Sequence, residues 1–65
     1  MNISDIQVGK KYYIQSSFGS GRLVEGIITN VEYDIKNGTP GVDYETEDGE
    51  GSWAYDHQVK KAVDL

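Results

Sequence analysis

The chain has 65 residues, and eleven Asp and Glu against six Lys and Arg give it a formal net charge of −5. A chain of this length predicts one domain over residues 1–65, with little room for a deep catalytic cleft. It contains no cysteine, which excludes disulfides, zinc–thiolate sites and thiol catalysis. The start carries no basic and apolar leader, and no window approaches the ~20 apolar residues of a membrane span. We therefore expect a soluble cytoplasmic protein.

The acidic balance disfavours direct binding to DNA or RNA, because contacts to phosphate supply most of the affinity of nucleic-acid binders. Two lysine pairs, Lys10-Lys11 and Lys60-Lys61, keep a local basic patch open as an alternative. The simpler interpretation of the acidity is that it keeps a small domain soluble.

The first eight residues predict a single turn, because the segment 2–8 is too short for an independent helix. Ser4 or Asp5 is expected to cap that turn. Its apolar side chains are expected to pack on one end of the sheet as a plug: Ile3, Ile6 and Val8.

A first strand is predicted over 10–15, with Tyr12 and Ile14 on one face and Tyr13 on the other. The Ser- and Gly-rich stretch 16–21 predicts a loop and lacks the glycine pattern of a phosphate-binding loop. Phe18 within it is either a lid over the core edge or a ligand contact. We keep Tyr13 and Phe18 as exposed aromatic candidates for binding a partner.

The stretch 22–33 predicts a second strand with apolar residues on both faces. Ile27 and Val31 share one parity, whereas Ile28 has the other. A strand that bends sharply, so that its halves bury opposite faces, gives such a pattern. The β-branched residues, with Gly26 and Asn30, argue against a helix. Asn37-Gly38 then predicts a turn within 34–41.

The clearest signal in the chain is the stretch 41–49, which alternates strictly. Asp43, Glu45 and Glu47 share one face, and the intervening apolar and Thr side chains share the other, as in a strand with one wet acidic face. Asp48-Gly49 provides the reversal into a returning strand over 52–55. A short 3₁₀ break is predicted at 56–58, followed by a last strand over 59–65 with Val59 and Val63 inward.

Strands spaced about ten residues apart and joined by Gly-rich turns predict an all-β fold. We expect a small five-stranded antiparallel barrel with a short N-terminal turn and a 3₁₀ turn before the last strand. The expected core consists of Tyr12, Ile14, Ile27, Val31, Val42, Tyr44, Trp53 and Val59.

Several of these segments resemble the SH3-like small barrels, and within them the Tudor and KOW type. They are Val8-Gly9-Lys10 before Tyr12, the stretch 26–31, and Val42-x-Tyr44 leading through Asp48-Gly49 to Trp53, with Val59 and Val63 after it. The Tudor resemblance implies an aromatic cage, with a carboxylate from Asp43 or Glu45, that holds a methylated lysine or arginine by cation–π attraction. Its candidate aromatics are Phe18, Tyr33, Tyr44, Trp53 and Tyr55. The KOW resemblance implies contact with nucleic acid or with the transcription and translation machinery.

The carboxylates of 43–50 lack the calcium-loop pattern, because its glycine and its chelating Glu are out of place. His57 is the single histidine and has no nucleophile motif or second histidine beside it. We therefore expect no metal, no cofactor and no enzyme activity.

The function we expect is a non-enzymatic protein-binding module. Its acidic strand face, Asp43, Glu45 and Glu47, would dock on a basic surface of a larger protein, with Tyr13 and Phe18 as aromatic contacts. Small acidic proteins of this kind are typical of phage- or bacterially encoded modulators of a host nucleic-acid machine. The alternatives are a Tudor-like reader of basic or methylated peptides and a KOW-like nucleic-acid-binding barrel. The oligomeric state, monomer or weak dimer, stays open.

Overall fold

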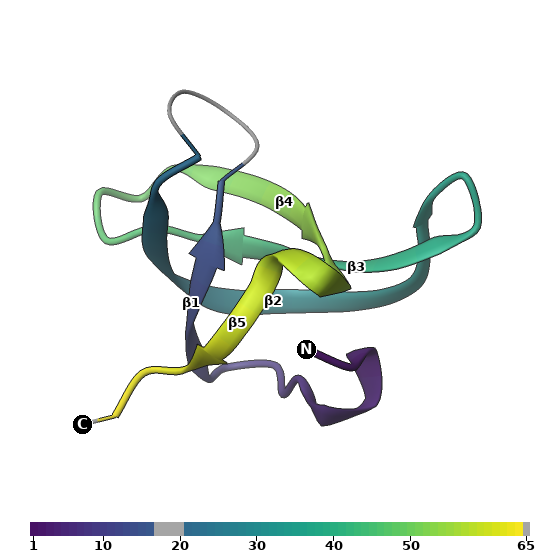
Figure 1. The fold of residues 1–65 in the computed structure, drawn as a ribbon. Helices are drawn as coiled ribbons and strands as arrows, with labels where there is room; N and C mark the ends of the chain where they lie inside the picture. The colour runs from purple at the N-terminus through teal and green to yellow at the C-terminus, as the bar shows by residue number, and fades with distance from the viewer. Residues whose placement is uncertain (17–20, 65) are drawn as a thin grey trace.

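A computed structural model describes residues 1–16 and 21–64 of the chain, and it is all-β as predicted. Its five strands form one antiparallel sheet in the order β4-β3-β2-β1-β5 (Figure 1). Phe18 lies outside the described residues. No helix in the described part is long and apolar enough to cross a membrane. The elements are η1 (Ile3–Asp5), β1 (Lys11–Gln15), β2 (Leu23–Lys36), β3 (Thr39–Glu45), β4 (Gly51–Tyr55), η2 (Asp56–Gln58) and β5 (Val59–Ala62).

Strand β2 bends, and the bend changes the face that it buries. Its pairing with β3 shifts register between Ile28 and Asn30, as at a β-bulge. Before the shift Ile28 is 1% exposed, and after it Val31 packs partly against the core. The predicted bend is therefore confirmed. The assignment of Ile27 to the core is wrong, since Ile27 is 44% exposed.

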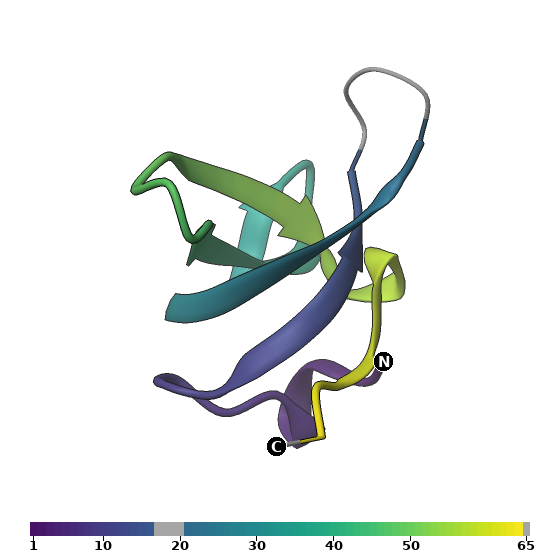
Figure 2. The same cartoon turned by 90° about the vertical axis from the view of Figure 1, so that its left-hand side faces the viewer.

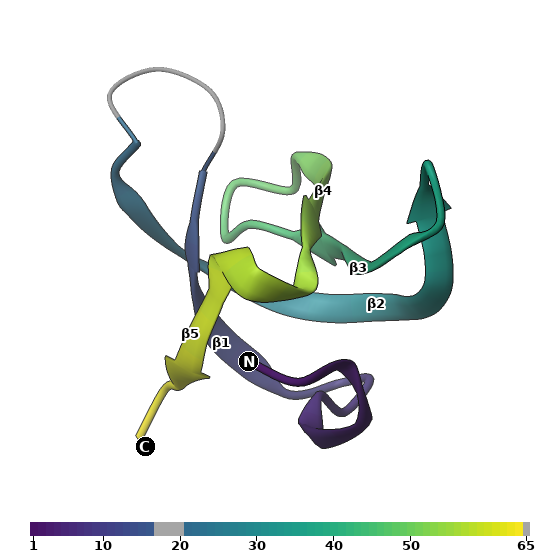
Figure 3. The ribbon, with the colours of Figure 1, turned by 45° about the vertical axis from the view of Figure 1, so that its right-hand side comes forward.

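The hairpin between β2 and β3 is tighter than predicted. Asn37 and Gly38 both have positive φ, 54° and 77°, as a two-residue type I′ turn requires. The Gly38 N–H donates to Asp34 Oδ1 at 2.8 Å. Strand β2 consequently runs on to Lys36, and the hairpin projects as an arm that turns away from the rest of the sheet (Figures 1 and 3).

The register of the β3–β4 hairpin decides which aromatic side chains are buried. Val42 lies opposite Ala54, and Asp43 lies opposite Trp53. Ala54 is 2% exposed, so it is the inward residue of β4, whereas Trp53 is half-buried on the outer face. The assignment of Trp53 to the core is therefore wrong. Trp53 and Tyr55 share one face of β4 as predicted, but the register set by the turn places that face outward.

The core lies between the curled halves of the sheet and the N-terminal segment. Two side chains of that segment complete it as predicted, Ile3 and Ile6. Val8 is 61% exposed, contrary to the prediction, and Asn2, not Ser4 or Asp5, occupies the N-cap position without a side-chain cap. The buried apolar residues are Ile3, Ile6, Tyr12, Ile14, Ile28, Val42, Tyr44, Ala54 and Val59.

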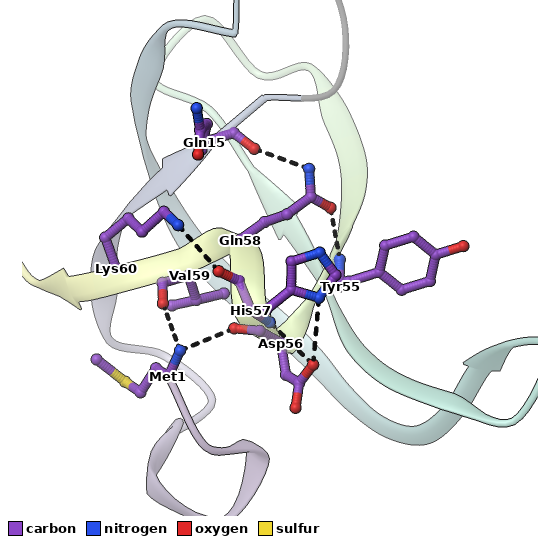
Figure 4. Close-up of polar contacts among 8 residues, drawn as sticks. All are labelled: Met1, Gln15, Tyr55, Asp56, His57, Gln58, Val59 and Lys60. Carbon is purple, nitrogen blue, oxygen red and sulfur yellow. Dashed lines mark hydrogen bonds and ion pairs between the residues drawn. The ribbon is translucent and has the colours of Figure 1, made fainter.

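A side-chain amide bridges the strands where no backbone ladder joins β4 to β5. Gln58 accepts a hydrogen bond from the Tyr55 N–H at 2.9 Å and donates one to the Gln15 carbonyl at 3.0 Å (Figure 4). In the described part of the chain, β4 pairs with β3 alone and β5 with β1 alone. The sheet is therefore curled but not closed by its strands.

The N-terminal segment lies against the last strand (Figure 2). The Met1 ammonium donates to the carbonyls of Asp56 and Val59, at 3.0 and 2.7 Å (Figure 4). These two bonds tie the first turn to η2 and β5 across the whole length of the chain.

Candidate functional site

Outward side chains of β2, β3 and β4 meet on one surface of the sheet. Asp43 lies opposite Asn30 on β2 and opposite Trp53 on β4, and side chains at paired positions point to the same side. The resulting surface, which we call the acidic–aromatic face, consists of Glu32, Asp43, Glu45, Trp53 and Tyr55.

The aromatic part of this face is an ordered row of rings. The Trp53 and Tyr55 centroids are 5.1 Å apart with planes at 89°, the edge-to-face geometry that aromatic pairs prefer. Tyr55 in turn stacks on the His57 ring, with the two ring centroids 5.5 Å apart. The Lys36 Nζ lies 5.6 Å from the Trp53 ring centroid, within the range of a cation–π contact. The Trp53 ring thus already accepts an ammonium group.

In the acidic part of the face, several carboxyl groups of the same charge lie close together. The pKa of Glu32 is raised by desolvation, by the charge of Asp43, by a hydrogen bond with the Asp43 side chain and by the charge of Asp34. A raised pKa means that these neighbours disfavour the ionised carboxylate. A cation brought to this surface would relieve the repulsion.

Replacing Glu32 with glutamine is expected to raise the melting temperature at pH 7. Because the folded-state pKa of Glu32 is raised, its ionisation costs stability: the penalty is absent below the unfolded-state pKa and grows as the pH rises through the folded-state pKa. The gain should therefore disappear near pH 3.5, below the ordinary Glu pKa of about 4.3. Thermal melts of both proteins at the two pH values measure it.

The exposed Glu25, also on β2 but outside this cluster, provides the matched control. The Glu25→Gln change should give no comparable gain at pH 7. A gain from Glu32→Gln that is equal at both pH values would contradict a charge effect.

The structure brings together only some of the predicted partner-binding residues. Asp43 and Glu45 lie on the acidic–aromatic face as predicted. Glu47 lies beyond the end of β3, in the turn, with its carboxylate 3.7 Å from the Lys11 Nζ. Tyr13 lies on β1, separated from β3 by β2, and the Lys61 Nζ is 5.6 Å from its ring centroid. Phe18 lies outside the described residues.

The aromatic cage implied by the Tudor resemblance is assembled only in part. Trp53 and Tyr55 contact each other on the outer face. Tyr44, by contrast, is 4% exposed and belongs to the core. Tyr33 is 72% exposed, and no ring contact joins it to the other aromatics in the described part of the chain.

Sequence reasoning missed Glu32 as a site residue and misplaced Trp53. Counting from the Asp48-Gly49 turn would have found Trp53, since a three-residue loop with a glycine at positive φ pairs Tyr44 with Ser52. No comparable signal marks Glu32, because its position depends on the bulge in β2.

The lysine pairs that kept nucleic-acid binding open are largely engaged within the chain. Lys11 is paired with Glu47. The Lys60 Nζ donates to the His57 carbonyl at 3.1 Å, and the Lys61 Nζ lies over Tyr13. These contacts weaken a phosphate-binding role for Lys11, Lys60 and Lys61.

Within the described residues, no group of three His, Asp or Glu side chains is placed to hold a metal ion. No protein-family model, curated protein or solved structure matches the chain. The chemistry of the acidic–aromatic face is therefore the basis for a functional assignment.

Proposed function

We propose that this chain is a non-enzymatic protein-binding module that docks its acidic–aromatic face on a basic surface of a larger protein. The observation that carries the proposal is the crowding of the Glu32 and Asp43 carboxyl groups beside the half-buried Trp53. Lys and Arg side chains of a partner would relieve the like-charge repulsion, and the Trp53 and Tyr55 rings would supply contact area.

The wider proposal is a cytoplasmic SH3-like barrel of the Tudor or KOW type, encoded by a phage or a bacterium, that modulates a host nucleic-acid machine. On a protein surface that ordinarily binds DNA or RNA, the carboxylates would occupy the positions of phosphates. The net charge of −5 and the internal contacts of Lys11, Lys60 and Lys61 support a protein partner over direct nucleic-acid binding.

Affinity capture from a cell lysate with two charge-reversal variants tests this function. One variant carries Asp43→Lys and Glu45→Lys on the face. The matched control carries Asp5→Lys and Asp64→Lys, two exposed positions in η1 and after β5, so both proteins gain the same charge. Circular dichroism first establishes that both variants fold.

Wild type and control are expected to capture the same dominant basic protein, and the face variant is expected to lose it. Equal capture by all three proteins would remove the acidic–aromatic face from the interface. Recovery of nucleic acid in place of a protein would overturn the proposal in favour of the KOW-like alternative.

A second candidate function, reading of a single basic or methylated side chain, is favoured by the position of the Lys36 Nζ over the Trp53 ring. A partner's ammonium group could replace Lys36 there. Titration with a peptide containing either lysine or trimethyl-lysine distinguishes the two functions. A reader is expected to prefer the trimethylated peptide at least tenfold, whereas a docking module should bind both alike.

A further inference from the structure

The two edge strands of the sheet differ in their protection. Exposed edges are commonly blocked by charged side chains or proline, which prevent pairing with another chain. Strand β5 carries Lys60 and Lys61 among its four residues. Strand β4, Gly-Ser-Trp-Ala-Tyr, has neither a charge nor a proline. Its edge is therefore open to an added strand.

The turn before β4 fixes which backbone groups point outward from that edge. The Thr46 N–H donates to the Glu50 carbonyl at 3.0 Å, and backbone bonds alternate along an antiparallel pair. Ser52 and Ala54 consequently bond to β3, and the alternate residues, Gly51, Trp53 and Tyr55, direct their N–H and C=O groups away from it.

A hydrogen bond at the end of β4 supports this assignment of the outward-pointing residues. The Tyr55 N–H donates to the Gln58 side chain, as an outward-pointing group would. Of the three outward-pointing residues, Gly51 and Trp53 are left. No strand among the described residues pairs with β4 on the side away from β3. The backbone N–H and C=O groups of both residues are therefore directed so that they can pair with a further strand.

There is also space beside this edge. A hollow of about 330 Å³ is lined by residues of β4 and its neighbours, which are Ser16, Val24, Tyr44, Thr46, Glu50, Gly51 and Ser52. A side chain added at Gly51 would meet no atom within 4 Å. A short extended segment along β4 would direct its inner side chains toward this hollow, where Val24 and Tyr44 supply apolar surface.

We infer that the partner binds by adding a short basic strand along the free edge of β4. This inference rests on the proposed docking function and specifies how the partner is held. An added strand would lie about 4.8 Å from β4 and about 10 Å from β3. Its outward side chains would lie next to Trp53, and a long Lys or Arg side chain would reach the carboxylates of Asp43 and Glu45.

A synthetic peptide of alternating lysine and valine, six residues long and blocked at both ends, is the probe. Two further versions carry N-methyl groups either on the lysine amides or on the valine amides, which removes the donors of one edge and keeps charge and composition. The protein variants are Gly51→Pro, which removes an outward N–H of β4, and the control Gly51→Ala, which keeps it.

The unmodified peptide is expected to bind wild type, to slow hydrogen exchange at the Trp53 amide, and to bind Gly51→Ala more tightly than Gly51→Pro. Binding is expected to fall at least tenfold for Gly51→Pro and for one of the two methylated peptides. NMR titration and amide exchange measure both effects. If Gly51→Pro does not fold, the comparison between the methylated peptides on wild type decides the question.

Equal binding of all three peptides, without protection at Trp53, would overturn strand addition. So would a failure of the unmodified peptide to bind wild type at millimolar concentration. Either result leaves docking through the acidic–aromatic face to the capture experiment, which does not depend on strand addition. Conversely, peptide binding that survives Asp43→Lys with Glu45→Lys would overturn the basic character of the added strand.

Discussion

Replacing Ile28 with alanine is expected to lower the free energy of unfolding by about 2–5 kcal/mol, and the same change at Ile27 should cost less than about 1 kcal/mol. The two isoleucines are adjacent and chemically identical, but Ile28 is 1% exposed and Ile27 is 44% exposed. Truncation at Ile28 leaves a cavity in the core, whereas truncation at Ile27 uncovers a surface that water already reaches.

Urea denaturation followed by circular dichroism measures both losses. The total stability of a domain this small is about 3–5 kcal/mol, so the Ile28→Ala protein should be largely unfolded at room temperature. Equal losses at the two positions would contradict the register in which Ile28 lies opposite the buried Tyr44 and Ile27 lies opposite the exposed Glu45.

The contrast between Ile27 and Ile28 also shows which parts of the fold can be predicted from sequence. The strict alternation of Asp43, Tyr44 and Glu45 correctly predicted a strand with one wet face, and Asn37-Gly38 correctly predicted the turn before it. Ile27 was misassigned because the second strand has apolar residues of both parities. The face that each half buries is set by the bulge and by pairing with β3, which the strand's own residues do not encode.

The candidate site, like the fold, was only partly predictable from the sequence. Asp43 and Glu45 share a strand, so alternation alone places them together. Glu32 and Trp53 join them from β2 and β4, and their positions depend on the registers of two pairings. Tyr13 was predicted to be exposed on the face of β1 opposite to Tyr12, but it is half-buried, and the strand order separates it from β3. A face built across several strands is therefore only partly visible in the sequence.

Gly41 lies on β3 between two neighbouring strands, β2 and β4. It pairs with Glu32 on β2 and with Tyr55 on β4. A Cβ added there would collide with the backbone carbonyl oxygen of Ala54 and would lie 2.5 Å from Cγ2 of Ile35. A main-chain oxygen held in the β3–β4 pair cannot move aside as the end of a flexible side chain can.

The Gly41→Ala change is therefore expected to cost about 3 kcal/mol, at the upper end of the usual penalty for overpacking. The Gly51→Ala protein is the matched control, because its new Cβ meets nothing within 4 Å and should leave stability nearly unchanged. Urea denaturation of the two variants measures the difference. A Gly41→Ala protein as stable as the control would show that β4 can shift away from β3 at little cost.

The same collision should act on the acidic–aromatic face, since Asp43 and Trp53 lie opposite each other two residues further along this pair. At temperatures where the Gly41→Ala protein stays folded, separation of β4 from β3 is expected to weaken partner capture as well. The Ile28→Ala change buries its defect in the core and leaves that pairing intact, so its folded fraction should capture normally. Close contact at Gly41 would thus be required for the acidic and aromatic halves of the face to act as one surface.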